Sequence, residues 1–368
     1  MTTTGTVLTR RDLNRATLER QLLLRRARMT ALDAVEHLVG LQAQAVRPPY
    51  HALAARLADF RPEELSGLLD DRRVVRIALM RSTIHLVSAA DCLALRPLVQ
   101  PVHDRVFQGN HGKRLGGVDL ERLAALAREL VEERPLTFKA LGEQLRAHWP
   151  DRDGQDLAMA ARTVLPLVQV TPRGLWGRSG PVAHTTAEHW LGAALDPAPD
   201  LPGTLLRYLA AFGPASAKDM QTWCGLTRLR EVMDGLRARL RTFRDERGVE
   251  LFDLPDAPRP APDTPAPPRF LPEYDNLLLS HADRSRVISD AHRPRIWQGN
   301  QAYSAFLVDG FVRGVWRLEQ AGGTAALVLE PFTRLTPAER AALEPEAAAV
   351  LAMTAPEATA HDVRFLPA

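Results

Sequence analysis

Two glutamines separated by one alanine, Gln42-Ala43-Gln44, are the residues of this sequence best suited to chemistry. The apolar spacing before them predicts a helix that begins near Thr30 and ends at this motif, where both amides can face one concavity beside Arg47 and Tyr50. Glutamine is a poor general base, but its amide can orient a water molecule and hold carbonyl oxygen density near a developing positive charge. Taken alone, this spacing is more typical of helix-end caps that hydrogen-bond to backbone groups.

Other kinds of catalytic centre find little support in the sequence. The lysines are Lys113, Lys139 and Lys218, whereas a glycosylase that opens DNA through a Schiff base needs a desolvated lysine. The histidines lack HxH and HxxxH spacing, and the two cysteines, Cys92 and Cys224, stand apart and are expected to be core thiols. Since a glycine-rich phosphate loop is also missing, we predict neither a metal nor a cofactor.

Basic side chains supply the candidates for contact with DNA phosphates. His85 lies in the apolar segment LMRSTIHLV together with Arg81, and it could border the site, although a core histidine is the more frequent case. The SHADRSR stretch fits a DNA-contacting loop and a salt-bridged edge of a β-rich domain equally well. A genome of high GC content also explains why arginine outnumbers lysine. The predicted DNA-binding residues are Arg47, Arg81, His85, Arg173, Arg178, Arg284 and Arg286.

Two stretches of the first half predict helices followed by paired strands. The first has a helix at 12–28, with one face to pack and a basic face to meet phosphate, and a strand pair or wing at 76–87. The second has a helix-turn-helix at 136–149 and a strand hairpin at 164–176, whose turn is Thr171–Gly174 with Arg173 near the tip.

The third stretch carries the clearest helix-turn-helix pattern. Ser216 is expected to cap one helix and Gly225 to break it, and a hairpin is expected at 243–252. The proline-rich segment 255–268 predicts a semi-rigid linker. Beyond it, alternating apolar residues and a final helix at 337–353 predict a small β-rich domain.

Composition and charge limit the class of protein. With 368 residues, 45% hydrophobic and 25% charged, the chain is long enough for two to four globular domains. Its net charge is only +3. We expect a cytoplasmic protein without a membrane partner, since the sequence lacks both a run of about 18 apolar residues and an N-terminal signal pattern.

Five sequence segments, in this order, resemble the AlkZ and YcaQ family of winged-helix DNA glycosylases. They are GLQAQ, LMRSTIHLV, WGRSGP, PEYDNLLLSHADRSRVI and GFVRGVWRLE. The resemblance implies an α+β fold of three tandem winged-helix domains followed by a C-terminal β-barrel. The expected boundaries are 8–118, 119–195 and 200–256 for the winged helices, 257–269 for the linker, and 270–368 for the barrel with its terminal helix.

The same resemblance implies that Gln42 and Gln44 are the catalytic residues, with Ala43 in the apolar middle position. The YcaQ branch carries aspartate at the place of Gln44, so this sequence sides with the AlkZ branch. That branch is linked to self-resistance against DNA-alkylating natural products of the azinomycin type.

The predicted reaction is monofunctional hydrolysis of N7-alkylated guanine, including bulky adducts and interstrand crosslinks, from double-stranded DNA by a monomer. An N7-alkylated guanine already carries positive charge, so two neutral amides could suffice to direct water and stabilise the sugar cation. The alternative is a winged-helix transcriptional regulator that needs no catalysis. A regulator would read DNA with the helix predicted at 227–236, usually as a dimer on a palindromic site, whereas three different units favour asymmetric binding by one chain.

Overall fold

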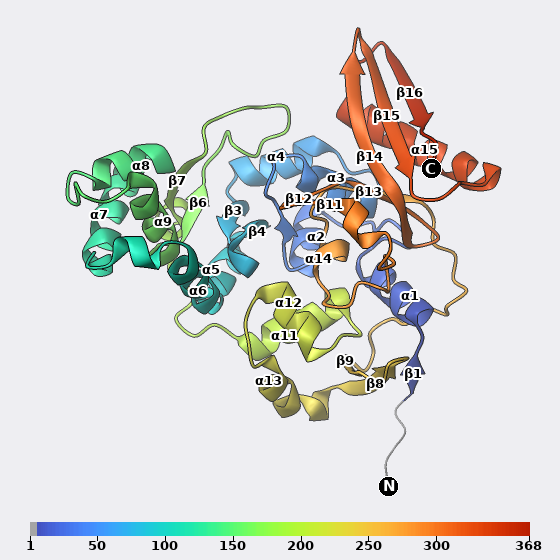
Figure 1. Ribbon diagram of the computed structural model, residues 1–368, viewed down its shortest axis with the longest axis horizontal. Coiled ribbons are helices and arrows are strands. Elements are labelled where there is room, and N and C mark those ends of the chain that lie inside the picture. The colour runs from blue at the N-terminus through green and yellow to red at the C-terminus, as the bar shows by residue number, and fades with distance from the viewer. Residues whose placement is uncertain (1–5) are drawn as a thin grey trace.

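The computed structural model describes residues 6–368 and shows a mixed α/β protein (Figure 1). The predicted strand pair at 76–87 is confirmed, since β3 and β4 pair antiparallel. The helix predicted at 12–28 is shorter and ends at Arg20. The elements of this first stretch are β1 (Val7–Leu8), α1 (Arg10–Arg20), α2 (Ala31–His37), β2 (Leu41–Gln42), α3 (Pro48–Arg56), α4 (Pro62–Asp70), β3 (Val74–Ala78), β4 (Ile84–Ser88), α5 (Ala89–Leu98) and α6 (Gln100–Asn110).

A six-stranded sheet with the order β2-β4-β3-β6-β7-β5 continues from the first stretch into the second. The prediction of a hairpin at 164–176 is wrong. Strand β6 pairs antiparallel with β7, but a long loop at 170–182 separates the two strands. That loop packs on α3, where the Tyr50 hydroxyl donates to the Gly174 carbonyl at 2.8 Å. The elements here are α7 (Leu120–Glu133), β5 (Leu136–Thr137), α8 (Phe138–Leu145), α9 (Gly154–Val164), β6 (Leu167–Gln169), β7 (Ala183–Thr186) and α10 (Ala187–Leu191).

The third stretch confirms the predicted cap and helix break. The Ser216 hydroxyl accepts from the Asp219 N–H at 3.2 Å, and Gly225 ends the helix with a φ of 85°. A Cβ at Gly225 would lie 2.9 Å from Val102 Cγ1, so glycine also permits the close approach of α6. The elements are α11 (Leu201–Phe212), α12 (Ala217–Cys224), α13 (Leu229–Gly235), β8 (Arg241–Asp245) and β9 (Glu250–Asp253).

The C-terminal strands form an open sheet with the order β10-β13-β14-β15-β16, so the expected closed barrel is wrong. Helix α15 crosses between β15 and the parallel strand β16, and its Leu343 and Leu351 pack with Phe306 and Leu327 of the sheet. Because this helix covers one face, the sheet buries its apolar side without closing. The elements are β10 (Arg269–Leu271), α14 (Asn276–Leu279), β11 (Trp297–Gln298), β12 (Gln301–Ala302), β13 (Ala305–Val308), β14 (Phe311–Ala321), β15 (Thr324–Pro331), α15 (Pro337–Thr354) and β16 (Ala360–Phe365).

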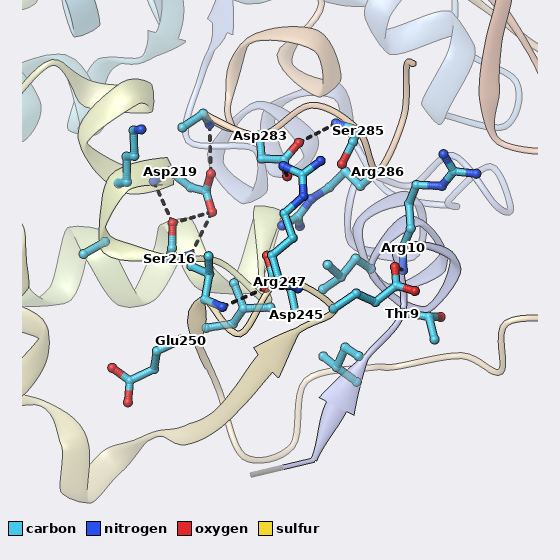
Figure 2. A pocket seen from close by; sticks show the side chains of 18 of the residues that line it. Thr9, Arg10, Ser216, Asp219, Asp245, Arg247, Glu250, Asp283, Ser285 and Arg286 are labelled. Carbon is cyan, nitrogen blue, oxygen red and sulfur yellow. Dashed lines mark hydrogen bonds and ion pairs between the residues drawn. The ribbon is translucent and has the colours of Figure 1, made fainter. Parts of the chain in front are cut away.

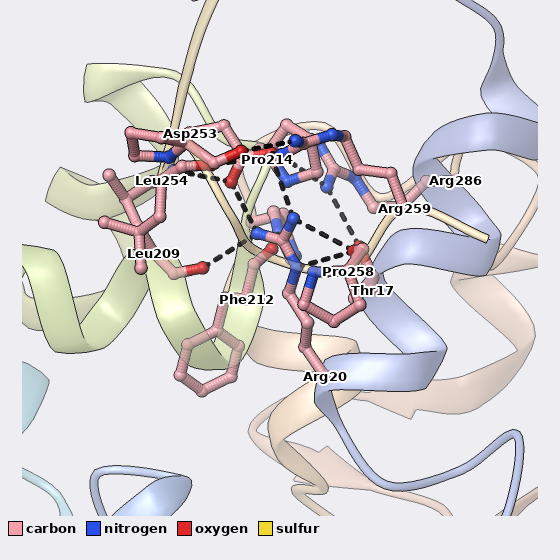
Figure 3. A network of polar contacts seen from close by, with 12 residues as sticks. Thr17, Arg20, Leu209, Phe212, Pro214, Asp253, Leu254, Pro258, Arg259 and Arg286 are labelled. Carbon is pink, nitrogen blue, oxygen red and sulfur yellow. Dashed lines mark hydrogen bonds and ion pairs between the residues drawn. The ribbon is translucent and has the colours of Figure 1, made fainter. Parts of the chain in front are cut away.

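Arginines on helix α1 point into the interior of the protein and bind internal partners. Buried Arg20 forms a two-point ion pair with buried Asp253, at 2.6 and 2.9 Å, and also donates to the Pro258 carbonyl (Figure 3). Buried Arg15 donates to the Thr264 carbonyl at 2.6 Å, so the proline-rich segment lies along α1 as a strap. The prediction that this face meets phosphate is therefore wrong for Arg15 and Arg20, since their guanidinium groups already hold internal partners.

A shared apolar core fixes the third stretch against the six-stranded sheet. Ile77 of β3 and Val102 of α6 belong to the same buried cluster as Phe212 of α11 and Trp223 of α12. This packing brings the end of α12 next to the loop between β3 and β4. Within residues 6–368, no helix combines the length and apolar character needed to cross a membrane.

Candidate active site

The glutamine motif lies on a short strand, so its predicted place at a helix end is wrong. Helix α2 ends at His37, and the backbone then turns through Val39, at a φ of 53°, and Gly40, at 89°. A Cβ at Gly40 would lie 2.6 Å from Val87 Cγ1, which is why the turn needs glycine there. Strand β2 then pairs with β4, and Gln42 lies opposite His85.

Because the backbone is extended, the side chain of Ala43 points to the opposite side of the strand from those of its two glutamine neighbours. Leu41 and Ala43 both point into one buried apolar cluster, so Gln42 lies on the opposite side of the strand. The Ala43 N–H continues the pairing by donating to the Ile84 carbonyl at 2.7 Å. Gln44 is exposed, and its Oε1 accepts a long hydrogen bond of 3.4 Å from the Ile84 N–H.

Arg81 orients the amide of Gln42. The turn between β3 and β4 places Arg81 and Ser82 in left-handed backbone conformations, at φ values of 56° and 58°. Two such residues in succession are costly and are often found at functional sites. From this turn the Arg81 guanidinium donates to Gln42 Oε1 at 2.7 Å and to the Trp223 carbonyl. Because a guanidinium can only donate, the oxygen of Gln42 faces Arg81 and its NH2 group remains for another partner.

His85 lies beside this pair as a neutral side chain. Its Nδ1 donates to the Thr83 carbonyl at 2.9 Å, which leaves the Nε2 lone pair 3.5 Å from the Arg81 Nη2. Burial, together with the charge of Arg81, lowers the pKa of His85 to about 3. Burial also lowers the pKa of Arg81 to about 10, so Arg81 keeps its charge near neutral pH.

Buried Arg76, which is not among the predicted site residues, holds the backbone of the glutamine motif. Its guanidinium donates to the carbonyls of Ala43 at 2.7 Å and Ala45 at 3.2 Å, and to Gln169 Oε1 at 3.1 Å. Burial lowers the pKa of Arg76 to about 10. The signal was available, because one arginine interrupts the otherwise apolar strand VVRIA and buried cations need dedicated acceptors.

Gln44 opens onto a hollow between the first stretch and the C-terminal stretch. This hollow has a volume of about 480 Å³ and is also lined by Glu273, Tyr274, Gln298 and Asn300. A neighbouring hollow of about 390 Å³ is lined by Arg47 and again by Glu273. The structure therefore brings Gln44 and Arg47 to adjoining hollows, with amide and carboxyl groups around them.

The remaining predicted arginines lie at different distances from this centre. Arg173 and Arg178 belong to the loop 170–182, not to a hairpin tip, and Arg178 is exposed. Arg284 is half-buried, and its charge contributes to lowering the pKa of Arg81. The two guanidinium groups are therefore close enough for their charges to interact. Arg286 is buried and donates to Thr17 Oγ1 at 3.1 Å and to the Pro214 carbonyl at 2.9 Å, so a phosphate contact would require those bonds to break.

Another hollow, about 930 Å³, lies elsewhere, between α1, α12 and the β8–β9 turn (Figure 2). Arg247 and Asp283 pair across it at 3.1 Å, and the Asp219 carboxylate accepts hydrogen bonds from Ser216. Arg230 and Glu250, which also line it, form a second ion pair at 2.7 Å. Within residues 6–368, no cluster of His, Cys, Asp and Glu could hold a metal ion. We therefore place the candidate site at the glutamine motif.

Comparison with known proteins agrees with the resemblance of the five segments. A family model described as DNA glycosylase AlkZ-like matches residues 35–353. A protein named interstrand DNA cross-link repair glycosylase, from Streptomyces sahachiroi, is 26% identical over 367 residues, covering 90% of this chain and 93% of the relative. The solved structure of Streptomyces sahachiroi DNA glycosylase AlkZ shares the fold, with a TM-score of 0.79, 22% identity, and coverage of 98% of this chain and 100% of that chain. Since the family model spans most of the chain, this protein belongs to the AlkZ-like DNA glycosylase family and is a hydrolase of N-glycosyl bonds.

Proposed function

We propose that this enzyme repairs DNA interstrand crosslinks and bulky adducts by hydrolysing the glycosidic bond of N7-alkylated guanine. The relative from Streptomyces sahachiroi is named for repair of interstrand crosslinks, and it aligns with nearly the whole chain. Adducts of the azinomycin type are the expected substrates, and self-resistance to such a compound is the expected role. The products are the free modified base and an abasic site.

The observation that carries the proposal is the pair of neutral amides at the site. Gln42 is fixed by Arg81 at 2.7 Å, and its neighbour His85 is neutral. Guanine alkylated at N7 is already cationic, so its departure needs no acid. The amides of Gln42 and Gln44 then direct a water molecule to the sugar carbon and stabilise the positive charge that develops there.

The lysines support hydrolysis without strand cleavage by a Schiff base. Lys113, Lys139 and Lys218 are all exposed. An amine nucleophile must be desolvated or placed beside another cation to react as a free base near neutral pH. The proposed enzyme is therefore monofunctional.

We further propose that one chain binds duplex DNA through three winged-helix domains, at 8–118, 119–195 and 200–256. The exposed Arg47 and Arg178 and the half-buried Arg173 and Arg284 are the candidate phosphate contacts, whereas Arg81 is engaged with Gln42. Binding through such contacts weakens steeply as the salt concentration rises.

The regulator alternative finds less support in the third stretch. Helix α13 would be the recognition helix, but its Arg230 pairs with Asp234 at 3.2 Å and with Glu250 at 2.7 Å. Arg237, just beyond the helix, also pairs with Glu250, at 2.9 Å. These carboxylates occupy the arginines that would otherwise read base edges.

The proposal is tested by base release from duplex DNA that carries an N7-alkylguanine or an azinomycin-type crosslink. We expect release by the wild type, a strong loss in Gln42→Ala and Gln44→Ala with DNA binding retained, and full activity in Gln155→Ala. Gln155 is an exposed glutamine at the start of α9, so it controls for loss of an amide as such. If the wild type releases no base from such substrates but binds duplex DNA specifically, the regulator alternative replaces the proposal.

A further inference from the structure

The proposed hydrolysis leaves one requirement open, because the attacking water must lose a proton. Neutral amides such as those of Gln42 and Gln44 have almost no basicity. His85 is a poor acceptor, since its pKa of about 3 makes it a weak base and its Nε2 faces the Arg81 cation. The site needs a further group that accepts a proton.

Glu273 lies where such a group is needed. It follows β10 and lines the hollow of about 480 Å³ together with Gln44, and it also lines the adjoining hollow beside Arg47. The side chain is half-buried, and within residues 6–368 no hydrogen bond or ion pair engages its carboxyl group. A half-buried carboxyl group without an internal partner is costly for stability, which favours a functional reason for its presence.

The segment around Glu273 is anchored to the strand that carries Gln42. Asp275 forms a two-point ion pair with buried Arg56, with both distances 2.8 Å. The Asn276 side-chain amide donates to the carbonyl of Gly40 at 2.8 Å, directly before β2. Tyr274, between Glu273 and these anchors, has a strained φ of 61°, and its hydroxyl donates to the Asn300 carbonyl at 2.9 Å. These contacts fix Glu273 relative to the glutamine motif.

We propose that the Glu273 carboxylate is the general base of the reaction. The oxygen of the water bonds to the anomeric carbon, the carbon–nitrogen bond to the base breaks, and its electron pair neutralises the cationic purine. The proton of the water passes to Glu273. This inference rests on the proposed function and adds a catalytic residue to it.

The surroundings of Glu273 determine how the reaction should depend on pH. Burial raises the pKa of Glu273 above its ordinary value of 4.5, which brings the carboxylate closer to the pKa that suits a base near neutral pH. Base release should therefore fall as the pH falls through this raised pKa, because the protonated carboxyl group cannot accept a proton. The other titratable groups that line the two hollows are Arg47, His51, Tyr274, Tyr303 and Arg317.

The test compares Glu273→Gln with Glu344→Gln under single-turnover conditions on DNA carrying an N7-alkylguanine. Glu344 is exposed on α15, so both variants lose one negative charge and have the same net charge. We expect Glu273→Gln to bind the DNA like the control but to release base about 100-fold more slowly, at the low end of what general bases contribute. We also expect the acidic limb of the pH profile to disappear in Glu273→Gln and to remain in Glu344→Gln.

Two results overturn the role of Glu273 alone. One is base release by Glu273→Gln at a rate near that of the wild type. The other is a slow variant that keeps the acidic limb, since this outcome shows a structural role only. Absence of release by the wild type is a different result, because it removes the proposed function as well.

Discussion

Replacing Arg81 by methionine should slow base release by about 10- to 150-fold. The guanidinium is the only cation bonded to Gln42 Oε1 within residues 6–368, at 2.7 Å. A hydrogen bond that involves a charged group contributes about 1.5–3 kcal/mol. If the whole contribution serves to orient the amide in the transition state, each ~1.4 kcal/mol corresponds to a tenfold change in rate.

A double-mutant cycle with Gln42→Ala separates orientation from other effects of Arg81. The four proteins are the wild type, Arg81→Met, Gln42→Ala and the double variant, each in single-turnover base release with enzyme in excess over DNA. Saturating enzyme removes differences in DNA affinity from the measured rate. Because Arg81 acts on the reaction through Gln42, we expect the double variant to be no slower than Gln42→Ala, with a coupling energy of about 1.5–3 kcal/mol.

The result that refutes this reasoning is additivity of the two losses. If the double variant is slower by the product of the two single factors, Arg81 acts independently of Gln42, for example on a phosphate. Arg81 also donates to the Trp223 carbonyl, so thermal unfolding of Arg81→Met must be measured beside the rates. A variant unfolded at the assay temperature calls for Arg81→Gln, whose side-chain amide can still donate one hydrogen bond to either acceptor.

Two further predictions concern stability. Asp275→Asn should lower the free energy of unfolding by about 3–5 kcal/mol in urea titrations, since it breaks the ion pair with Arg56, in which both side chains are fully buried. A loss below about 1 kcal/mol would contradict the importance of this anchor. His51 has a pKa lowered to about 4 by burial, so between pH 6.5 and about 4 the unfolded chain binds a proton that the native chain does not. The free energy of unfolding should therefore fall with falling pH by up to ~1.4 kcal/mol per pH unit because of this residue. In His51→Gln the free energy of unfolding should depend less steeply on pH. Equal slopes in the two proteins would contradict this expectation.

The sequence predicted local features well where a local pattern determines the structure. The cap at Ser216 and the break at Gly225 were confirmed, because a hydroxyl at a helix start and a glycine at a left-handed position act within a few residues. The pairing of β3 with β4 followed in the same way from short apolar strands close in sequence. The helix assigned to the glutamine motif failed, because the positive φ of Val39 and Gly40 and the partner strand β4 outweighed the helical spacing.

What the sequence determined by itself is the family and the chemical character of the candidate site. Amides at Gln42 and Gln44, few lysines and five ordered segments are properties of the chain, independent of how it folds. Tertiary structure decided which side chains lie together. Arg76 and Arg81 belong to the first stretch, and Glu273 belongs to the C-terminal stretch. Pairing of β3 and β2 with β4, packing of α12 and anchoring of Asp275 on Arg56 bring them around the glutamine motif. Such contacts depend on long-range burial and ion pairing, which leave no periodic trace in the sequence.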